Sequence, residues 1–324
     1  MKNTLLGALG TITVVSSLSL FGAGGSLASQ AAVSISHPPT VSSVAPLSKS
    51  GATTTSSSTT TSTSSTTTTV ASGTTTTTEP VTTTTTIPDP FTWAPLSTYL
   101  KTRSSNVTVG FYDVTTGQTY LYRDGVRMLT ASMVKIDILA DLLYRAQVAK
   151  RSLTASEKNL ATSMVEDSDN NAAQSLWEDI GQLPAIASFN KQMGYQETIP
   201  DWGWGNMNTT PSDELRLLKT ILFPNKILTA SSQAYEQGLM EHVVSYQRFG
   251  IPYGVPSGAL VGNKNGWYPE AGTGWQVNSA GFVKKGDTYY LAVVMTGSNP
   301  DETYGIDTVD RVGSLLWQFA STHS

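Results

Sequence analysis

A low-complexity tract limits where this chain can fold. Between residues 51 and 87, 28 of the 37 residues are Ser or Thr, and Glu79 carries the only charge. Such a segment has almost no apolar surface to bury, so chain entropy keeps it disordered. We therefore predict a flexible Ser/Thr-rich stalk over residues 32–88 and a folded domain over residues 89–324, a length that suits one domain with a sizeable core.

The segment before the stalk is typical of a secretory signal peptide. Lys2 is followed by the apolar run Leu5–Phe21 and then by small residues up to Ala31. We predict a signal peptide over residues 1–31 and a secreted or cell-surface protein. The apolar run is marginal in length for a membrane span, and an uncleaved anchor that tethers the protein to the membrane or the cell wall is the alternative.

Composition excludes several classes of protein. The chain has no Cys, and of its three His residues only His242 lies well inside the predicted domain. Neither a thiolate nucleophile nor a zinc ligand cluster can be built from this set, so we expect no metal and no cofactor. A Ser-His-Asp triad would depend on His242 alone. The domain carries 18 basic and 23 acidic residues without a basic cluster, which argues against a nucleic-acid partner.

Hydrophobic periodicity predicts strands at both ends of the domain and a helical block between them. The predicted strands are Val107–Asp113, Thr119–Arg123, Ala259–Asn265, Gln276–Val283 and Tyr289–Thr296. The predicted helices are Thr92–Thr102, Ser132–Val148, one that begins after a capping box at Thr154, Asn170–Ile180, Leu183–Met193, Ser212–Leu222, Ser231–Gln247 and Asp307–Ala320. This order indicates an α+β fold, in which an antiparallel sheet of about five strands is flanked by helices and carries an inserted helical subdomain.

Ser132 and Lys135 are a candidate nucleophile and base. They lie one turn apart at the start of a predicted helix and therefore share a face. A serine hydroxyl becomes a good nucleophile when a base removes its proton, and a lysine amine can do so if burial or a second cation lowers its pKa. The Ser-x-x-Lys spacing also occurs at Ser188–Lys191, inside a predicted helix, so it is a weak signal alone. The alternative is a capping Ser132 with a solvated Lys135.

Two further motifs follow in a meaningful order. Ser168-Asp169-Asn170 opens a predicted helix, and Lys264-Asn265-Gly266 is expected at the end of a predicted strand. Together with Ser132 and Lys135 they resemble the fingerprint of the class A β-lactamase and penicillin-binding-protein superfamily, which is Ser-x-x-Lys, Ser-Asp-Asn and Lys-Thr-Gly. The resemblance covers about Phe91–Ser324.

The resemblance implies a role for each motif residue. It assigns as catalytic Ser132, Lys135, Ser168 and Lys264, and as substrate-binding Asn170, Asn265, Gly266 and Trp267. Ser168 would relay a proton to the leaving group, Asn170 would hydrogen-bond the substrate amide, and Lys264 would add positive potential. The backbone N–H groups of Ser132 and Trp267 would form the oxyanion hole.

The chain also departs from this family. Asn265 stands where the family has Thr or Ser, and the loop Tyr195–Asn208 is short and lacks the family's water-activating Glu. Glu197 and Asp201 are the only carboxylates in that loop. Its segment Trp202–Gly205 either lines the cleft, where it could stack on a sugar or an apolar acyl group, or packs as a plug.

We therefore predict a serine hydrolase that forms an acyl-enzyme on an amide or ester, either a small molecule or a peptidoglycan-derived substrate in the cell wall. One alternative is a β-lactamase or a D-alanyl-D-alanine carboxypeptidase. An alternative of another class is a catalytically idle binding module at the cell surface.

Overall fold

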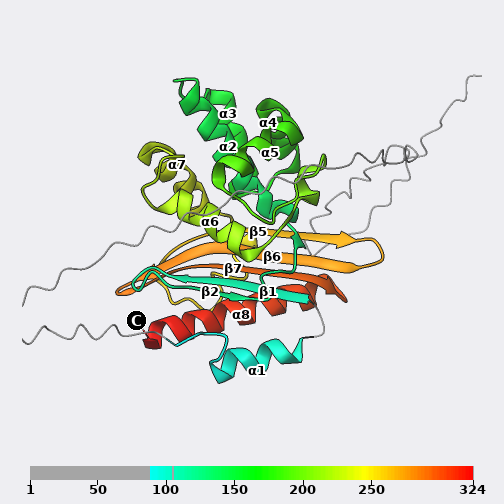
Figure 1. Cartoon of the computed structure of the whole chain (residues 1–324), viewed down its shortest axis with the longest axis vertical. Coiled ribbons are helices and arrows are strands. Elements are labelled where there is room, and N and C mark those ends of the chain that lie inside the picture. Colours follow the sequence, from blue (N-terminus) through cyan, green and yellow to red (C-terminus); the bar gives the residue numbers. More distant parts are fainter. Residues whose placement is uncertain (1–87, 104–105, 324) are drawn as a thin grey trace, which may run out of the picture. The chain divides into compact units, whose positions relative to one another are not determined.

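The computed structural model describes residues 88–103 and 106–323. These residues all belong to the unit Thr78–Ser324. The predicted signal peptide and all but the last residue of the predicted stalk lie outside the described residues. Within the described part, an antiparallel sheet separates two layers of helices, with α1 and α8 on one face and α2 to α7 on the other (Figure 1).

The elements follow the predicted order of strands, helices and strands. The helices are α1 (Ala94–Thr102), α2 (Lys135–Val148), α3 (Ala155–Glu166), α4 (Asn170–Ile180), α5 (Gln182–Met193), α6 (Pro211–Leu222), α7 (Ala230–Glu241) and α8 (Glu302–His323). Three short 3₁₀ turns are η1 (Ala131–Val134), η2 (Trp204–Asn206) and η3 (Ser245–Gln247). The strands are β1 (Asn106–Asp113), β2 (Thr119–Tyr122), β3 (Met128–Leu129), β4 (Asn208–Thr209), β5 (Leu260–Glu270), β6 (Gly274–Lys285) and β7 (Thr288–Asn299).

The main sheet has five strands in the order β2-β1-β7-β6-β5. Every neighbouring pair is antiparallel, and the first and last strands of the chain meet where β1 pairs with β7, from Asn106 opposite Gly297 to Asp113 opposite Tyr290. The predicted α+β fold is confirmed. Local signals set several helix starts. Thr154 and Glu157 form the predicted capping box of α3, and Pro211 occupies the first turn of α6.

Two apolar cores lie on the two faces of the sheet. Because side chains alternate along a strand, Leu291, Val293 and Met295 of β7 join the core under the helical block, whereas Ala292 and Val294 join the core against α8. β7 is therefore buried on both faces, which explains its continuous apolar run from Leu291 to Met295. No helix in the described ranges is both long enough and apolar enough to cross a membrane.

Several elements differ from the predictions. The predicted helix Asp307–Ala320 is longer, since α8 begins at Glu302 and ends at His323. β5 pairs with β6 from Leu260 to Glu270, so Lys264 lies in the middle of a strand and the prediction that it lies at a strand end is wrong. α7 ends at Glu241, because the chain turns and Val244 N–H donates to the Glu166 carbonyl. The two-residue strands β3 and β4 pair with each other and were not predicted, since so short a pairing leaves no periodicity.

Candidate functional site

Ser132 lies in a tight turn that the surrounding structure holds in place. Ala131, the preceding residue, has φ +47, a left-handed conformation that is unusual for a residue with a side chain. The side-chain amide of Asn278 on β6 donates to the carbonyls of Leu129 (2.8 Å) and Thr130 (3.2 Å) at the entry of this turn. Ser132 is half-buried. Among the described residues, no hydrogen bond involves its hydroxyl, which leaves that group available to a substrate.

Lys135 is the first residue of α2 and is fully buried. Its amine donates to the Ser168 carbonyl (2.5 Å), to the Ser168 hydroxyl (3.1 Å) and to Asn170 Oδ1 (2.8 Å). Burial lowers the pKa of Lys135 to about 7, although the nearby carboxylate of Asp169 acts in the opposite direction. Near neutral pH a substantial fraction of this amine is therefore unprotonated and able to accept a proton.

Lys264 reaches the same hydroxyl from the sheet. Its amine donates to Ser168 Oγ (2.9 Å), to the Asn265 carbonyl (3.1 Å) and to Gln247 Oε1 (3.4 Å), and its side chain is fully buried. Burial, and after it the charge of Lys135, lowers the pKa of Lys264 well below its usual value. Repulsion between two amines is mutual, so each charge also disfavours the other. The Ser168 hydroxyl thus bridges two amines that come from α2 and β5.

The Ser168 segment is shaped for this bridge. Ser168 has φ +57, another left-handed residue with a side chain. Asp169 then caps α4 by accepting from Ala172 N–H (2.6 Å). The strained backbone turns both the carbonyl and the hydroxyl of Ser168 toward Lys135. Asn170 is exposed, although its side-chain oxygen still binds Lys135.

Gly266 lets β5 approach the Ser132 turn. A Cβ at this position would lie 2.5 Å from the Thr130 carbonyl oxygen, 2.6 Å from Met133 N and 2.8 Å from Ser132 N. Any side chain would push the strand and the turn apart. Trp267, the next residue, is half-buried and packs edge-on against Phe249 with ring centroids 5.6 Å apart. The backbone at Gly266 and Trp267 therefore runs beside the N–H of Ser132.

Asn265 is held inside the protein by backbone carbonyls. It is fully buried, and its amide donates to the carbonyls of Gln247 (2.8 Å) and Phe249 (3.0 Å). The geometry therefore gives its predicted contact with substrate no support. The other motif residues, from Ser132 to Trp267, do converge, and their catalytic and binding roles stay predictions.

Gln247 is a site residue that the sequence did not reveal. It is buried in η3, donates from Nε2 to the Asp167 carbonyl (2.7 Å) and accepts from Lys264. Its own carbonyl accepts from Asn263 (3.1 Å) and Asn265. Gln247 therefore ties the Ser168 segment to β5. A lone Gln in a segment predicted as helix carries no signal of such a role.

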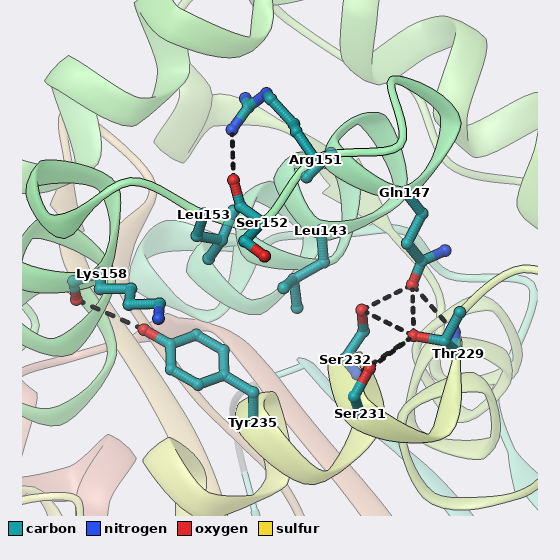
Figure 2. Close-up of a pocket in the computed structure, with 11 residues that line it drawn as sticks. Leu143, Gln147, Arg151, Ser152, Leu153, Lys158, Thr229, Ser231, Ser232 and Tyr235 are labelled. Carbon is teal, nitrogen blue, oxygen red and sulfur yellow. Dashed lines mark hydrogen bonds between the residues drawn. The ribbon is translucent and has the colours of Figure 1, made fainter.

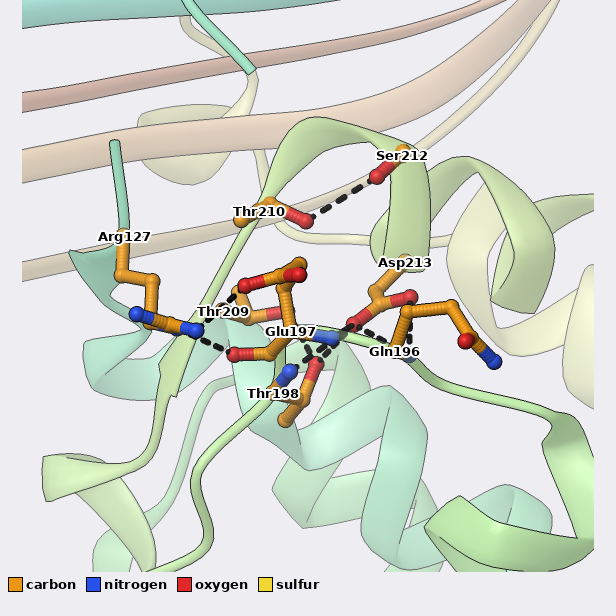
Figure 3. Close-up of polar contacts among 8 residues, drawn as sticks. All are labelled: Arg127, Gln196, Glu197, Thr198, Thr209, Thr210, Ser212 and Asp213. Atoms are coloured by element: carbon orange, nitrogen blue, oxygen red, sulfur yellow. Dashed lines mark hydrogen bonds and ion pairs between the residues drawn. The ribbon is translucent and has the colours of Figure 1, made fainter. Parts of the chain in front are cut away.

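The short loop before α6 brings no carboxylate to Lys135. Glu197 forms an exposed ion pair with Arg127, and Asp201 accepts from Gly203 N–H (2.8 Å). The start of the loop is fixed by Asp213 of α6, whose carboxylate accepts from the backbone N–H groups of Gln196, Glu197 and Thr198 (Figure 3). The loop instead brings Trp204 to Lys135, with the ring centroid 5.1 Å from Nζ.

A cavity of about 290 Å³ lies elsewhere, between the C-terminal end of α2, the start of α3 and the first turn of α7 (Figure 2). Several of its polar groups already have partners: Gln147 accepts from Thr229 and Ser232, and Arg151 pairs with Glu157. None of the motif residues lines it. In the part of the chain that the structure describes, no group of three or more acidic or His side chains could hold a metal ion.

Comparison with known proteins identifies the family and the fold of the chain. Residues 147–320 match the profile of the beta-lactamase enzyme family, a range that contains Ser168 and Lys264 but starts after Lys135. A beta-lactamase from Burkholderia vietnamiensis is 19% identical, with a TM-score of 0.62 over 71% of this chain and 97% of that one. The TLA-1 extended-spectrum beta-lactamase is 16% identical, with a TM-score of 0.63 over 70% of this chain and 96% of that one. At these identities the likeness shows the fold alone.

The curated relatives match a smaller part of this chain than the solved structures do. The proteins named "Putative lipoprotein LppW" of Mycobacterium tuberculosis and Mycobacterium bovis are 26% identical over 197 residues, which is 58% of this chain. The chain spans 62% of the length of these relatives.

Proposed function

Because the chain belongs to the beta-lactamase enzyme family and has the class A β-lactamase fold, we propose that it is a serine hydrolase that forms an acyl-enzyme on Ser132. The observation that carries the proposal is the Ser168 hydroxyl, which lies between the amines of Lys135 (3.1 Å) and Lys264 (2.9 Å). Burial and the closeness of the two amines disfavour the charged form of each. Lys135, which carries one of these amines, is the first residue of the helix that begins beside Ser132.

The chemistry follows from these positions. Unprotonated Lys135 takes the proton of Ser132, and Ser132 Oγ attacks the carbonyl carbon of an amide or ester. The backbone N–H groups of Ser132 and Trp267 stabilise the oxyanion. When the bond to the leaving group breaks, Ser168 donates its proton to that group and recovers one from Lys135. Asn170, exposed beside Lys135, hydrogen-bonds the substrate amide.

Release of the acyl group is the slow step in this proposal. Glu197 is paired with Arg127 and Asp201 caps its own turn, so neither supports a role as the base that activates water. This favours a hydrolase with a long-lived acyl-enzyme over a β-lactamase. The buried Asn265 likewise gives a substrate carboxylate no partner, which disfavours a D-alanyl-D-alanine carboxypeptidase.

We place the substrate in the cell wall and the protein outside the cytoplasm. The support is the N-terminal sequence, together with the name "lipoprotein" carried by the curated relatives. With no Cys in the chain, attachment through a lipidated Cys is not available to it. A small-molecule or peptidoglycan-derived amide or ester fits the proposal, without nucleic acid, metal or cofactor.

Intact-protein mass spectrometry tests the proposal. Exposure to a fluorophosphonate should add one phosphonyl group to the wild type, and peptide mapping should find it on Ser132. Ser132→Ala should not label, and Lys135→Met should label on the order of 10²–10⁴-fold more slowly. Ser188→Ala is the matched control, since Ser188–Lys191 repeats the spacing on the exposed side of α5. Labelling of Ser132→Ala at another residue would end the assignment of Ser132 as the nucleophile, and no labelling of the wild type would favour an idle binding module.

A penicillin separates the enzyme alternatives. If it reacts, the mass of the acyl-enzyme should persist for many minutes, and Glu197→Gln or Asp201→Asn should leave its lifetime unchanged. Rapid turnover that either substitution abolishes would show that the loop does supply the water base and would make the protein a β-lactamase.

A further inference from the structure

A tryptophan closes over the amine of the proposed base. The ring centroid of Trp204 lies 5.1 Å from Lys135 Nζ, and its Nε1–H donates to Gln174 Oε1 on α4 at 3.2 Å. The ring therefore reaches from the loop before α6 to the helix that carries Asn170. Lys135 is fully buried although the neighbouring Asn170 is exposed, so a cover between this amine and solvent is required.

The loop holds Trp204 in this position through its own hydrogen bonds. Asp201 accepts from Gly203 N–H (2.8 Å), and Asn206 N–H donates to the Gly203 carbonyl (2.7 Å), which forms the turn η2. A Cβ on Gly205 would lie 4.0 Å from the Cα of Ala131, so η2 packs directly on the turn that carries Ser132. The cover is thus built against both the nucleophile and the base.

We propose that Trp204 is a positioning residue of the acylation site: its indole, anchored on Gln174, keeps water away from the Lys135 amine. This inference rests on the proposed function, because it concerns how Lys135 serves Ser132. Trp204 itself exchanges no proton with the substrate. Its neighbour Trp202 is 64% exposed and provides a control from the same loop.

The direction of the effect follows from the groups around the amine. Burial is the largest cause of the lowered pKa of Lys135. The charge of Lys135 in turn lowers the pKa of Lys264 on β5, whose amine lies on the other side of the Ser168 hydroxyl. Asp169 at the start of α4 raises the pKa of Lys135, and the face of an indole also favours an ammonium group. Removing Trp204 admits water, which relieves the largest effect, so the pKa should rise. A branched apolar side chain such as leucine is smaller than the indole but still covers the amine with hydrocarbon, so it should keep water away better than alanine does.

The test is the pH dependence of fluorophosphonate labelling of Ser132, measured on the full chain by intact mass. We expect the rising limb of the wild type to have its midpoint near pH 7. In Trp204→Ala the midpoint should rise by one pH unit or more, whereas in Trp204→Leu it should stay at or below the wild-type value. Trp202→Ala should match the wild type. An unchanged or lowered midpoint in Trp204→Ala, or a Leu variant that behaves like the Ala variant, overturns the inference.

A second variant guards against a folding defect. Gln174 is exposed on α4, so Gln174→Leu should fold normally while it frees the indole, and its midpoint should shift in the same direction by a smaller amount. A wild-type midpoint in Gln174→Leu would show that the anchor does not matter and would overturn that part of the inference.

A readout independent of activity is the fluorescence of Trp204, taken as the difference between wild type and Trp204→Phe. It should change with a midpoint near pH 7 as the amine beneath the ring loses its proton. If this fluorescence does not titrate near pH 7, the result would count against Trp204 as the cover of the Lys135 amine. If the wild type never labels but the fluorescence of Trp204 titrates, the proposed function is wrong and the role of Trp204 as cover of the amine is supported. If Ser132 labels but the midpoint of its pH dependence is the same in Trp204→Ala, the role of Trp204 is wrong and the proposed function is supported.

Discussion

Asp137 lies on α2, two residues after Lys135, and is the most informative position for a test of the buried charges. Its side chain is fully buried, Oδ1 accepts from the Tyr195 hydroxyl (2.8 Å), and Oδ2 has no partner. Burial raises the pKa of Asp137 to about 7 from its usual 3.8, with a smaller contribution from the charge of Asp213. Two other buried carboxyls, Glu214 and Glu236, also have strongly raised pKa values.

The sign and size of the effect follow from this shift. Between about pH 4 and pH 7 the unfolded chain releases the Asp137 proton while the folded chain keeps it, so the free energy of unfolding falls as the pH rises through this window and stays low above it. A shift from 3.8 to about 7 corresponds to about 4 kcal/mol in total, and about 3 kcal/mol of this falls between pH 5 and pH 8.

Asp137→Asn should remove this pH dependence. Asparagine keeps an oxygen for Tyr195 and cannot ionise, but its amide donors are buried without an acceptor, which costs about 1–3 kcal/mol at every pH. The quantity to compare is therefore the slope. Relative to wild type, the variant's free energy of unfolding should rise by about 3 kcal/mol between pH 5 and pH 8.

Urea unfolding of the full chain at pH 5, 6, 7 and 8, followed by tryptophan fluorescence, measures this slope. Asp179→Asn, which removes an exposed carboxyl from α4, is the control and should leave the wild-type slope unchanged. Parallel curves for wild type and Asp137→Asn would refute the reasoning, because they would show that Asp137 is ionised in the folded protein throughout this range.

Two further substitutions test the site. Gly266→Ala should leave the thermal transition cooperative but slow the labelling of Ser132 by on the order of 10²-fold. The reason is that a Cβ 2.5 Å from the Thr130 oxygen displaces a donor of the oxyanion hole. Labelling at the wild-type rate would contradict the close approach of β5 to the Ser132 turn. Lys264→Met should move the rising limb of labelling to higher pH, because one cation fewer beside Lys135 raises the pKa of that amine, and an unmoved midpoint would show that Lys264 is already neutral when Lys135 titrates.

The sequence determined the features that depend on neighbouring residues. A Ser/Thr tract cannot build a core, so the sequence predicts that the folded domain begins after about residue 88, and this boundary stays a prediction. Periodicity and capping signals located most helices, including the start of α3 at Thr154 and of α6 at Pro211. The spacing of Ser132 and Lys135 and the order of the three motifs indicated the family, because these patterns are local and survive without knowledge of the fold.

Other features of the site required the tertiary structure. The Ser168 hydroxyl meets amines that lie 33 and 96 residues away in the sequence, and only the folded chain brings the Ser168 segment between Lys135 of α2 and Lys264 of β5. The side chains of Gln247 and Asn278 donate to backbone carbonyls. Every residue has a backbone carbonyl, so the sequence gives no sign of which one a side chain will bind. Trp204 could be read equally as lining or as plug until its ring was placed over Lys135. Whether a side chain faces water, a partner or the cleft, as for the buried Asn265, depends on which distant segments pack against it, and this is decided only when the whole chain has folded.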